Sequence, residues 1–279
     1  MNKKGGLIMI KDLEGKVVLV LGGGSVGPGW GIGKAICVKY AEAGAIVIVA
    51  DRELSAAQET LALIKSRGGQ GRAVEIDVTK DEDLTATIYK VIEALGQVDI
   101  LYCNVGVGKA GASEQTSPAD WRRISDANLT SLHVATSAVL PSMREKASGV
   151  ILTTSSIAAV RDVGYPHLAY GTTKAAAIHF MRLLAMENAC YGIRANTIIA
   201  GLIDTPRIEK TLANSYGKKT SDEMRAARAM QCPLGRMGTG FDIAEAALFL
   251  ASDKASYISG TEILIDGGLS ATVQQPPIF

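Results

Sequence analysis

Cysteine, histidine and aromatic residues are scarce in this chain. The 279 residues include four cysteines, three histidines and only 5% aromatic residues. The cysteines form no C-x-x-C pair, which disfavours a zinc knuckle or a dithiol redox site, and we expect isolated thiols in a reducing compartment: Cys37, Cys103, Cys190 and Cys232. The histidines do not cluster with acids or cysteines, so we expect no catalytic metal: His133, His167 and His179.

Strong net charge and long apolar runs are also missing. The formal net charge is +1 and 47% of the residues are hydrophobic, which favours neither a nucleic-acid partner nor disorder. The opening "MNKKGGLIMI" is too short for a signal sequence, and no run approaches the roughly 20 apolar residues of a membrane span. We therefore expect a soluble, cytoplasmic protein with no membrane partner.

Runs rich in Val and Ile alternate with segments of helical spacing. The runs lack polar alternation, so they predict strands covered on both faces: 16–21, 45–50, 72–76, 98–103, 149–154, 193–199 and 261–265. Helical spacing predicts helices at 33–44, 81–96 and 174–189. Strand followed by helix, repeated, predicts an α/β protein of three layers, with a doubly wound parallel sheet of seven strands and helices on both faces.

No repeat or Pro/Gly/Ser linker divides the chain, so we expect one domain over residues 1–279. A polar, lysine-rich stretch at about 204–233 interrupts the pattern after the sixth run. Long excursions of this kind are usually functional lids or mobile segments, and we interpret this one as a substrate loop.

A glycine-rich loop, "GGGSVGPGWGIG", follows the first strand and opens the first helix. In a dinucleotide fold this is where the pyrophosphate meets helix N–H groups, and Gly31 and Gly33 would allow close approach. Alone, such a loop could be a tight turn. Asp51 ends the second strand about 20 residues later, where a carboxylate can bind the adenosine ribose hydroxyls. It could also be a turn residue, and Arg52 beside it could favour NADP.

Four further residues have candidate roles, three of them at the carboxyl ends of strands and one inside a helical stretch. Asp77 follows the third strand, where it could meet adenine or cap a turn. Ser155 and Ser156 end the fifth strand, where either hydroxyl could bind a substrate oxygen. Asn128 lies inside a helical stretch although Asn is a poor helix former, which suggests that it holds water or a backbone group.

Tyr170 and Lys174 in "YGTTK" stand one helical turn apart and share a face. A nearby ammonium stabilises a phenolate and brings a phenol's pKa toward neutral, so the pair can serve as an acid/base group. An isolated Y-x-x-x-K is more often an ordinary exposed pair, so its interpretation depends on the other motifs in the chain.

Together these motifs resemble the short-chain dehydrogenase/reductase family, a Rossmann-fold family, from about Lys11 to Thr272. The matching segments are "CNVG" (103–106), Asn128, the serine pair, "YGTTK", "GLIDTP" (201–206) and the closing "ISGTEILIDGG" (258–268). Together with the glycine-rich loop these make seven features in one order, which are hard to obtain by chance.

The resemblance implies roles for individual residues. Tyr170 is implied as the acid/base, Lys174 as its pKa-lowering partner, Ser156 as the substrate-orienting hydroxyl and Asn128 as the holder of a relay water. Tyr165 and His167, between Ser156 and Tyr170, are expected to border the substrate. The implied cofactor-binding residues are Gly22, Gly31, Ile32, Gly33, Asp51, Asp77, Val78, Asn104, Gly106, Tyr170, Lys174, Ile203 and Thr205.

The chain also departs from the family pattern. Eight residues separate Gly22 from Gly31, more than the family spacing, and Leu21, Cys103 and Ala200 replace the usual Thr, Asn and Pro. Residues 23–30 are thus an extension beside the phosphate cradle. Pro28 and Trp30 predict a defined loop, either covering the pyrophosphate or forming an inert bulge.

We therefore expect an NAD-dependent oxidoreductase, with NADP less favoured, acting on a secondary alcohol or ketone. A steroid, cyclic alcohol, polyol or aryl ketone would each fit. Two alternatives are an NADPH-dependent 3-oxoacyl thioester (acyl carrier protein) reductase and a non-catalytic dinucleotide-binding sensor. The resemblance also implies a homotetramer.

Overall fold

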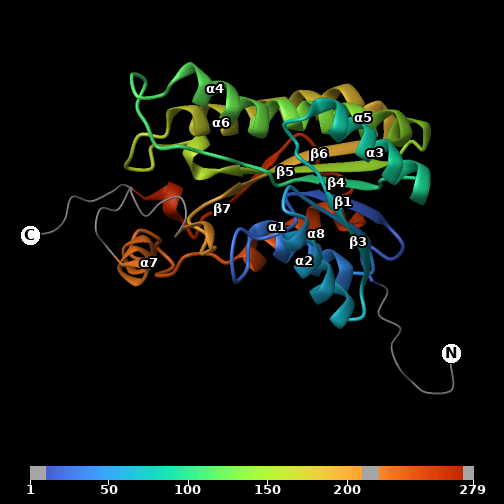
Figure 1. The fold of residues 1–279 in the computed structure, drawn as a ribbon, viewed down its shortest axis with the longest axis horizontal. Coiled ribbons are helices and arrows are strands. Elements are labelled where there is room, and N and C mark those ends of the chain that lie inside the picture. The colour runs from blue at the N-terminus through green and yellow to red at the C-terminus, as the bar shows by residue number, and fades with distance from the viewer. Residues whose placement is uncertain (1–10, 209–219, 273–279) are drawn as a thin grey trace, which may run out of the picture.

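One parallel sheet organises the structure, a computed structural model that describes residues 11–208 and 220–272. Its strand order is β3-β2-β1-β4-β5-β6-β7 (Figure 1). The strands are β1 (Val17–Leu21), β2 (Ile46–Asp51), β3 (Gln70–Glu75), β4 (Ile100–Cys103), β5 (Gly149–Ser156), β6 (Ile193–Ala200) and β7 (Glu262–Ile265). The order reverses between β1 and β4, which opens a crevice at their carboxyl ends.

Helices cover both faces of this sheet, as the sequence predicts. They are α1 (Ile32–Glu42), α2 (Leu54–Ser66), α3 (Asp81–Leu95), α4 (Pro118–Ser125), α5 (Ser131–Glu145), α6 (Leu168–Asn188), α7 (Ser221–Ala229) and α8 (Gly240–Ala251). One hydrophobic core joins α1, α2 and α8 to the sheet, and a second joins α3, α5 and α6 to the other face (Figure 1). The doubly wound, three-layer prediction is confirmed.

The expectation that all seven strands are covered on both faces is wrong for the two edges. β1 is buried at every position, whereas Gln70, Arg72 and Glu75 of β3 are exposed. Leu264 of β7 is 41% exposed. An edge strand has a neighbour on one side only, and its polar residues remain in solvent. In β3, exposed residues alternate with half-buried ones over most of the strand. The short run "RAVEI" does not show this alternation, because its apolar residues stand next to each other.

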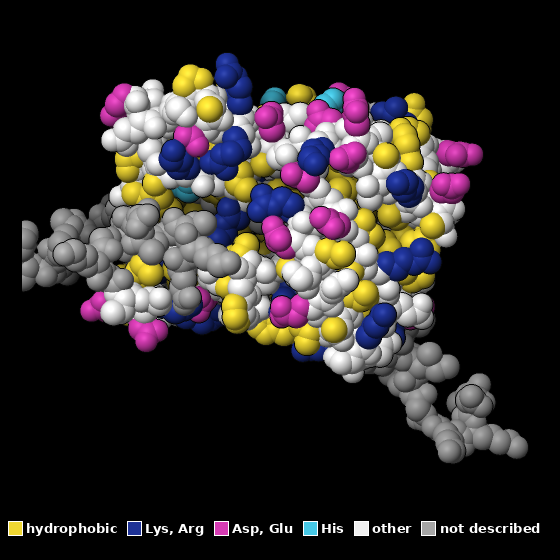
Figure 2. All heavy atoms as spheres, viewed as in Figure 1, with side chains coloured by type: hydrophobic (Ala, Val, Ile, Leu, Met, Phe, Trp, Pro, Cys, Tyr) yellow, Lys and Arg dark blue, Asp and Glu magenta, His cyan; other side chains and the backbone are white. Residues whose placement is uncertain are grey.

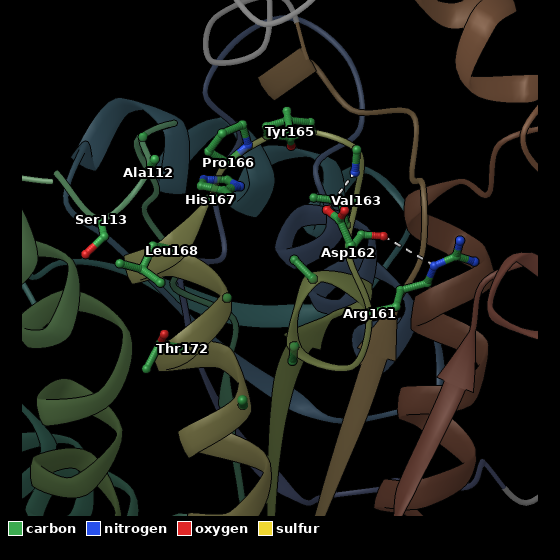
Figure 3. Close-up of a pocket in the computed structure, with 16 residues that line it drawn as sticks. Ala112, Ser113, Arg161, Asp162, Val163, Tyr165, Pro166, His167, Leu168 and Thr172 are labelled. Carbon is green, nitrogen blue, oxygen red and sulfur yellow. Dashed lines mark hydrogen bonds between the residues drawn. The ribbon is translucent and has the colours of Figure 1, made fainter. Parts of the chain in front are cut away.

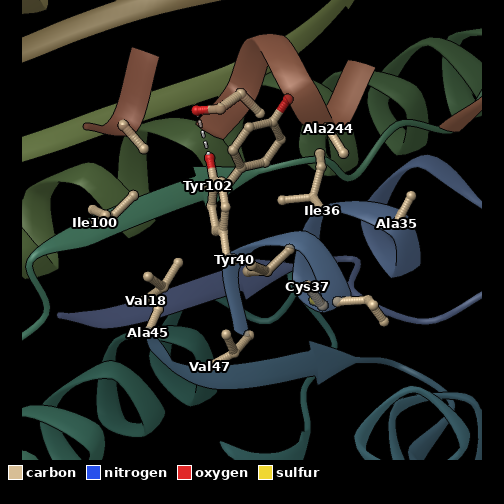
Figure 4. Close-up of a cluster of buried hydrophobic side chains, with 14 of the residues drawn as sticks. Val18, Ala35, Ile36, Cys37, Tyr40, Ala45, Val47, Ile100, Tyr102 and Ala244 are labelled. Atoms are coloured by element: carbon tan, nitrogen blue, oxygen red, sulfur yellow. Dashed lines mark hydrogen bonds between the residues drawn. The ribbon is translucent and has the colours of Figure 1, made fainter. Parts of the chain in front are cut away.

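Two buried tyrosines connect the layers near the crevice (Figure 4). The rings of Tyr40 on α1 and Tyr102 on β4 meet edge to face at 6.3 Å. The Tyr40 hydroxyl donates to the Ala247 carbonyl of α8 at 3.0 Å, and the Tyr102 hydroxyl bonds Thr154 Oγ1 of β5 at 2.9 Å. Burial raises the pKa of both phenols, so both stay protonated. The pairs fix α1 against α8 and β4 against β5.

Helix boundaries depart from expectation at two places. α6 begins at Leu168, before the predicted start at 174, because the polar residues around Tyr170 belong to its first turns. A π-helical turn, Asp126–Thr130, separates α4 from α5 and contains Asn128. The predicted substrate loop holds α7, and its residues 209–219 lie outside the described part of the chain. Within the described ranges, no helix has the length and apolar character needed to cross a membrane.

The approach of α1 to β1 gives a first test. A Cβ on Gly33 would lie 1.9 Å from the Gly22 carbonyl oxygen, so Gly33→Ala must push the helix away from the strand. We expect the free energy of unfolding to fall by about 1–3 kcal/mol and nucleotide affinity to fall with it, measured by urea denaturation and by NADH fluorescence titration.

Gly111→Ala is the matched control, because a Cβ there meets no atom closer than 3.4 Å. Equal stability of the two variants would contradict the steric argument.

Candidate active site

A cavity of about 700 Å³ opens at the carboxyl ends of the strands. It runs from Asp51 and Asp77 at one end, past the glycine loop, to Ser156, Tyr170 and Lys174. Figure 2 shows Lys and Arg side chains around the recess between the two helix layers. Segments far apart in the sequence thus share one site at the topological switch point.

The predicted phosphate cradle occupies the middle of this cavity. Gly22, Gly31, Ile32 and Gly33 all line it. The Asn104 side chain donates from Nδ2 to the Gly22 carbonyl at 3.0 Å, which closes the loop from the β4 side. A Cβ on Gly33 would meet Gly22, so the start of α1 packs closely on the strand end while it lines the cavity. This cradle fits a pyrophosphate.

Asp51 is held in place by two backbone groups. Its Oδ2 accepts from the Gly24 N–H at 2.9 Å and its Oδ1 from the Glu53 N–H at 3.1 Å. The adjacent Arg52 is exposed and its Nε lies 3.5 Å from the Glu53 carboxylate. The carboxylate therefore lines the cavity in a fixed position, with lone pairs left for further donors.

Residues after β3 and β6 complete the cavity wall. Asp77 accepts from the side chain and backbone of Thr79 at 2.7 and 3.0 Å, and these bonds, led by the hydroxyl, lower the pKa of Asp77. Val78 is buried beside it. Ile203 and Thr205 line the opposite end, where Ile203 is fixed by a β-bridge to Gly238. Asp77 thus caps a turn and lines the cavity, and its contact with adenine stays a prediction.

The extension at 23–30 is a defined loop. Trp30 packs on Phe241 of α8 at 4.7 Å, and the Lys34 and Arg67 cations lie 5.5 and 5.6 Å from its ring centroid. Thr60 donates to the Gly23 carbonyl at 3.1 Å. Ser25 and Val26 line the cavity, whereas the Trp30 ring lies against α8. The loop forms part of the cavity wall, and covering of a pyrophosphate stays a prediction.

Lys174 lies at the reacting end with its charge deeply buried. Its side chain is 3% exposed, and Nζ donates to the Thr154 carbonyl at 2.8 Å and the Val105 carbonyl at 3.2 Å. Nζ is 6.0 Å from the centre of the Tyr170 ring. Burial first, and then the charge of Arg207, lower the pKa of Lys174 to about 8, with Cys103 acting in the opposite direction. The predicted pair is thus brought together in the cavity.

Gly106 provides the room for this ammonium. A Cβ there would lie 2.9 Å from Lys174 Nζ. Because Gly106 also lines the cavity, the missing side chain lets the loop after β4 pass directly beside the catalytic candidates.

The two serines at the end of β5 differ in environment. Ser155 is buried and donates to the Lys174 carbonyl at 2.9 Å. Ser156 Oγ accepts from the Ala158 N–H at 3.2 Å, which leaves its proton available. Ser155 therefore braces α6, and the choice of Ser156 as the substrate hydroxyl agrees with this geometry.

Asn128, on the π-helical turn, braces the loop after β4 and helix α6. Its Oδ1 accepts from the Val107 N–H at 2.7 Å, and its Nδ2 donates to the Val107 carbonyl at 2.9 Å and to Thr173 Oγ1 at 3.0 Å. The side chain is 4% exposed. Its amide thus binds protein groups, as the sequence argument allowed, and the relay water stays a prediction.

Several residues at the site escape sequence reasoning. Thr154 bonds Tyr102 and Asn104, and its carbonyl holds Lys174. Thr173 accepts from Asn128 and donates to the Tyr170 carbonyl at 3.0 Å. Both threonines stand next to residues that motifs mark. Their contacts with Tyr102, Asn104 and Asn128 span 45 to 52 residues, so no local signal could identify these contacts. Among the described residues, no group of His, Cys, Asp and Glu could hold a metal.

Comparison with known proteins settles the family. A family model described as enoyl-(acyl carrier protein) reductase matches residues 27–270. A 2-(S)-hydroxypropyl-CoM dehydrogenase from Xanthobacter autotrophicus is 33% identical over 264 residues, which cover 94% of this chain and 100% of that protein. The chain belongs to the short-chain dehydrogenase/reductase family.

Solved structures of the family agree in fold. A short-chain type dehydrogenase/reductase from Mycobacterium marinum is 31% identical, with a TM-score of 0.82 over 94% of this chain and 98% of that one. A 7α-hydroxysteroid dehydrogenase solved with NADH and 7-oxo glycochenodeoxycholic acid is 34% identical, with a TM-score of 0.82 over 93% and 96%. Relatives of this family are dehydrogenases that act on alcohols.

The buried lysine gives a test of the site's electrostatics. The pKa of Lys174 falls from 10.5 to about 8 on folding. Between these values the unfolded chain keeps a proton that the folded chain loses, so stability rises with pH. We expect the stability of the wild type, relative to Lys174→Met, to rise by about 1.4 kcal/mol per pH unit above pH 8.

Urea denaturation of both proteins from pH 7 to 9.5 measures this difference. The difference should be flat below pH 8. A stability difference that does not change over the whole pH range would show that burial does not lower the pKa of Lys174.

Proposed function

We propose that the protein is an NAD-dependent oxidoreductase that transfers a hydride between the nicotinamide and a secondary alcohol or ketone. The observation that carries this proposal is the meeting of Tyr170, Lys174 and Ser156 in one cavity with the glycine cradle and Asp51. Three side chains suited to acid/base chemistry lie at one end, and groups suited to a dinucleotide lie at the other. We further propose that residues 1–279 act as one catalytic domain.

Tyr170 acts as the acid/base on the substrate oxygen. Ser156 orients that oxygen through its available hydroxyl proton, and Lys174 stabilises the phenolate form of Tyr170. Lys174 also binds the nicotinamide ribose, and Asn128 with Thr173 keeps the Tyr170 segment in register. The bound dinucleotide supplies the hydride acceptor or donor, and the cavity excludes water from the reacting atoms.

Asp51 supports NAD over NADP. Its carboxylate can accept from both ribose hydroxyls, whereas a 2′-phosphate would meet its negative charge. The two backbone bonds to Gly24 and Glu53 hold it there. Arg52, which could neutralise a phosphate, lies beside the Glu53 carboxylate. These contacts count against the NADPH-dependent 3-oxoacyl thioester reductase, which the same Tyr170 and Lys174 would otherwise serve.

The remaining alternative is a dinucleotide-binding sensor without turnover. The intact Asn128, Ser156, Tyr170 and Lys174 set counts against it, because a binding protein has no need of a buried ammonium beside a phenol. We also propose a homotetramer in the cytoplasm, and the exposed Leu183 and Met186 on α6 support a self-associating face.

Turnover with both cofactors tests the proposal directly. Absorbance of the reduced nicotinamide is followed with NAD and with NADP against cyclic, steroid, polyol and aryl secondary alcohols. We expect turnover with NAD and little with NADP. Preference for NADP would favour the thioester reductase, and binding without turnover would favour the sensor.

Tyr170→Phe tests the acid/base assignment. The phenyl ring keeps the packing but has no proton to exchange, so kcat should fall by about 10²–10⁴-fold while NADH affinity changes little. Fluorescence titration of NADH is the binding readout. Tyr191→Phe, on the exposed end of the α6 region, is the control and should keep full activity. Activity in Tyr170→Phe would overturn the assignment.

Asp51→Ser tests cofactor choice. Because the charged acceptor is lost, kcat/KM with NAD should fall by roughly 10–100-fold, and the activity with NADP should rise. Glu75→Ser removes an exposed carboxylate from the neighbouring strand β3 that does not line the cavity, and it serves as the control. An unchanged NAD to NADP ratio in Asp51→Ser would place the ribose elsewhere.

A further inference from the structure

Three aromatic rings stack at the reacting end of the cavity. Tyr165 and His167 lie 5.4 Å apart between ring centroids, and His167 and Tyr170 lie 4.6 Å apart with planes within 20° of parallel. His167 is the middle ring. Tyr165 and His167 also line an outer groove on the far side of the loop that joins β5 to α6 (Figure 3). One face of the Tyr170 ring is therefore covered by an imidazole.

The surroundings of the imidazole disfavour its charged form. Its Nε2 atom is buried and has no hydrogen-bond partner among the described residues. Burial, and then the positive charge of Arg207, lower the pKa of His167. A second proton on this ring would face the positive charge of Arg207, and Nε2 has no acceptor among the described residues. His167 can act on Tyr170 through shape and stacking but not through charge.

Gly108 lies directly against the Nε2 edge of the imidazole. A Cβ on Gly108 would lie 2.6 Å from His167 Nε2 and 3.2 Å from Tyr170 Cδ2. Two backbone hydrogen bonds join the loop after β4 to the segment that enters α6. The Gly111 N–H donates to the Pro166 carbonyl at 3.0 Å, and the Leu168 N–H donates to the Gly111 carbonyl at 3.4 Å. The loop after β4 thus encloses both rings and leaves no space for a side chain.

We propose that His167 is a positioning residue for Tyr170: a flat ring that fixes the angle of the phenol, with Gly108 as its steric complement. The helix fixes the Tyr170 backbone, which lies in the first turn of α6. It does not fix rotation of the side chain, and rotation would carry the hydroxyl away from the substrate oxygen. Proton transfer needs hydrogen-bond reach, so holding the ring supports kcat.

His167→Ala removes the ring, and His167→Phe keeps a flat ring without the nitrogens. Comparing the two variants shows whether the stacked ring itself supports catalysis. His167→Ala should lower kcat by roughly 10-fold without changing NADH affinity or the KM for NAD. His167→Phe keeps a flat ring and should recover kcat to within about twofold. His179→Ala removes an exposed imidazole from the same helix and should match the wild type. If His167→Ala does not fold, His167→Leu, which has volume but no flat ring, replaces it.

Two results would overturn the proposal. Full kcat in His167→Ala would show that the ring is not needed. Equal loss in the Ala and Phe variants would show that a nitrogen, and not the ring, does the work.

A double-mutant cycle with Gly108→Ala tests the steric complement. The added methyl should displace the imidazole and lower kcat in the wild-type background by roughly 10-fold, but cost much less in His167→Ala, where the ring is gone. Strictly additive losses would contradict the pairing.

The inference rests on the proposed role of Tyr170, and the results keep the two apart. Activity in Tyr170→Phe would refute the proposed function itself. An inactive Tyr170→Phe together with a fully active His167→Ala would refute only the role of His167.

Discussion

The arrangement of the site depends on the hydrogen bonds that the buried Lys174 ammonium donates to two backbone carbonyls. Its two bonds run to carbonyls of different elements, Thr154 at the end of β5 and Val105 after β4, while the lysine itself belongs to α6. A charge taken out of water is tolerated only where such acceptors are preformed. The sheet order supplies them, because β4 and β5 are neighbours whose carboxyl ends face α6. The fold and the chemistry thus share one constraint.

A second constraint links cofactor selection to the unusual glycine loop. Asp51 accepts from the Gly24 backbone, so the residue that would read the ribose also fixes the start of the extension. At the other end of the extension, a side chain on Gly29 would come within 3.3 Å of Pro206. The extension therefore spans from the Asp51 end of the cavity to the beginning of the predicted substrate loop. Its added length connects two regions that a shorter turn would leave separate.

Much of the fold could be predicted because periodicity and strand ends are local signals. The seven strands and the grouping of Tyr170, Lys174 and Ser156 follow from motifs read in order. The exposed residues of β3 could not be predicted from a five-residue run, since strand order decides which strands are edges. The roles of Thr154, Thr173 and Gly108 depend on partners brought from 20 or more residues away, such as Thr154 and Lys174. Pairings of this kind leave no pattern in a single sequence.

Trp30 gives the extension an optical property. The chain has two tryptophans. The other, Trp121, lies on α4 and is 39% exposed, whereas Trp30 has two cations within 5.6 Å of its ring centroid and packs against Phe241. Indole emission depends on nearby charge and on contact with water, so the two residues report from different environments. The loop that lines the nucleotide end of the cavity thus carries its own fluorophore, and with Trp121 replaced by Phe its emission alone would follow how that loop responds to a ligand.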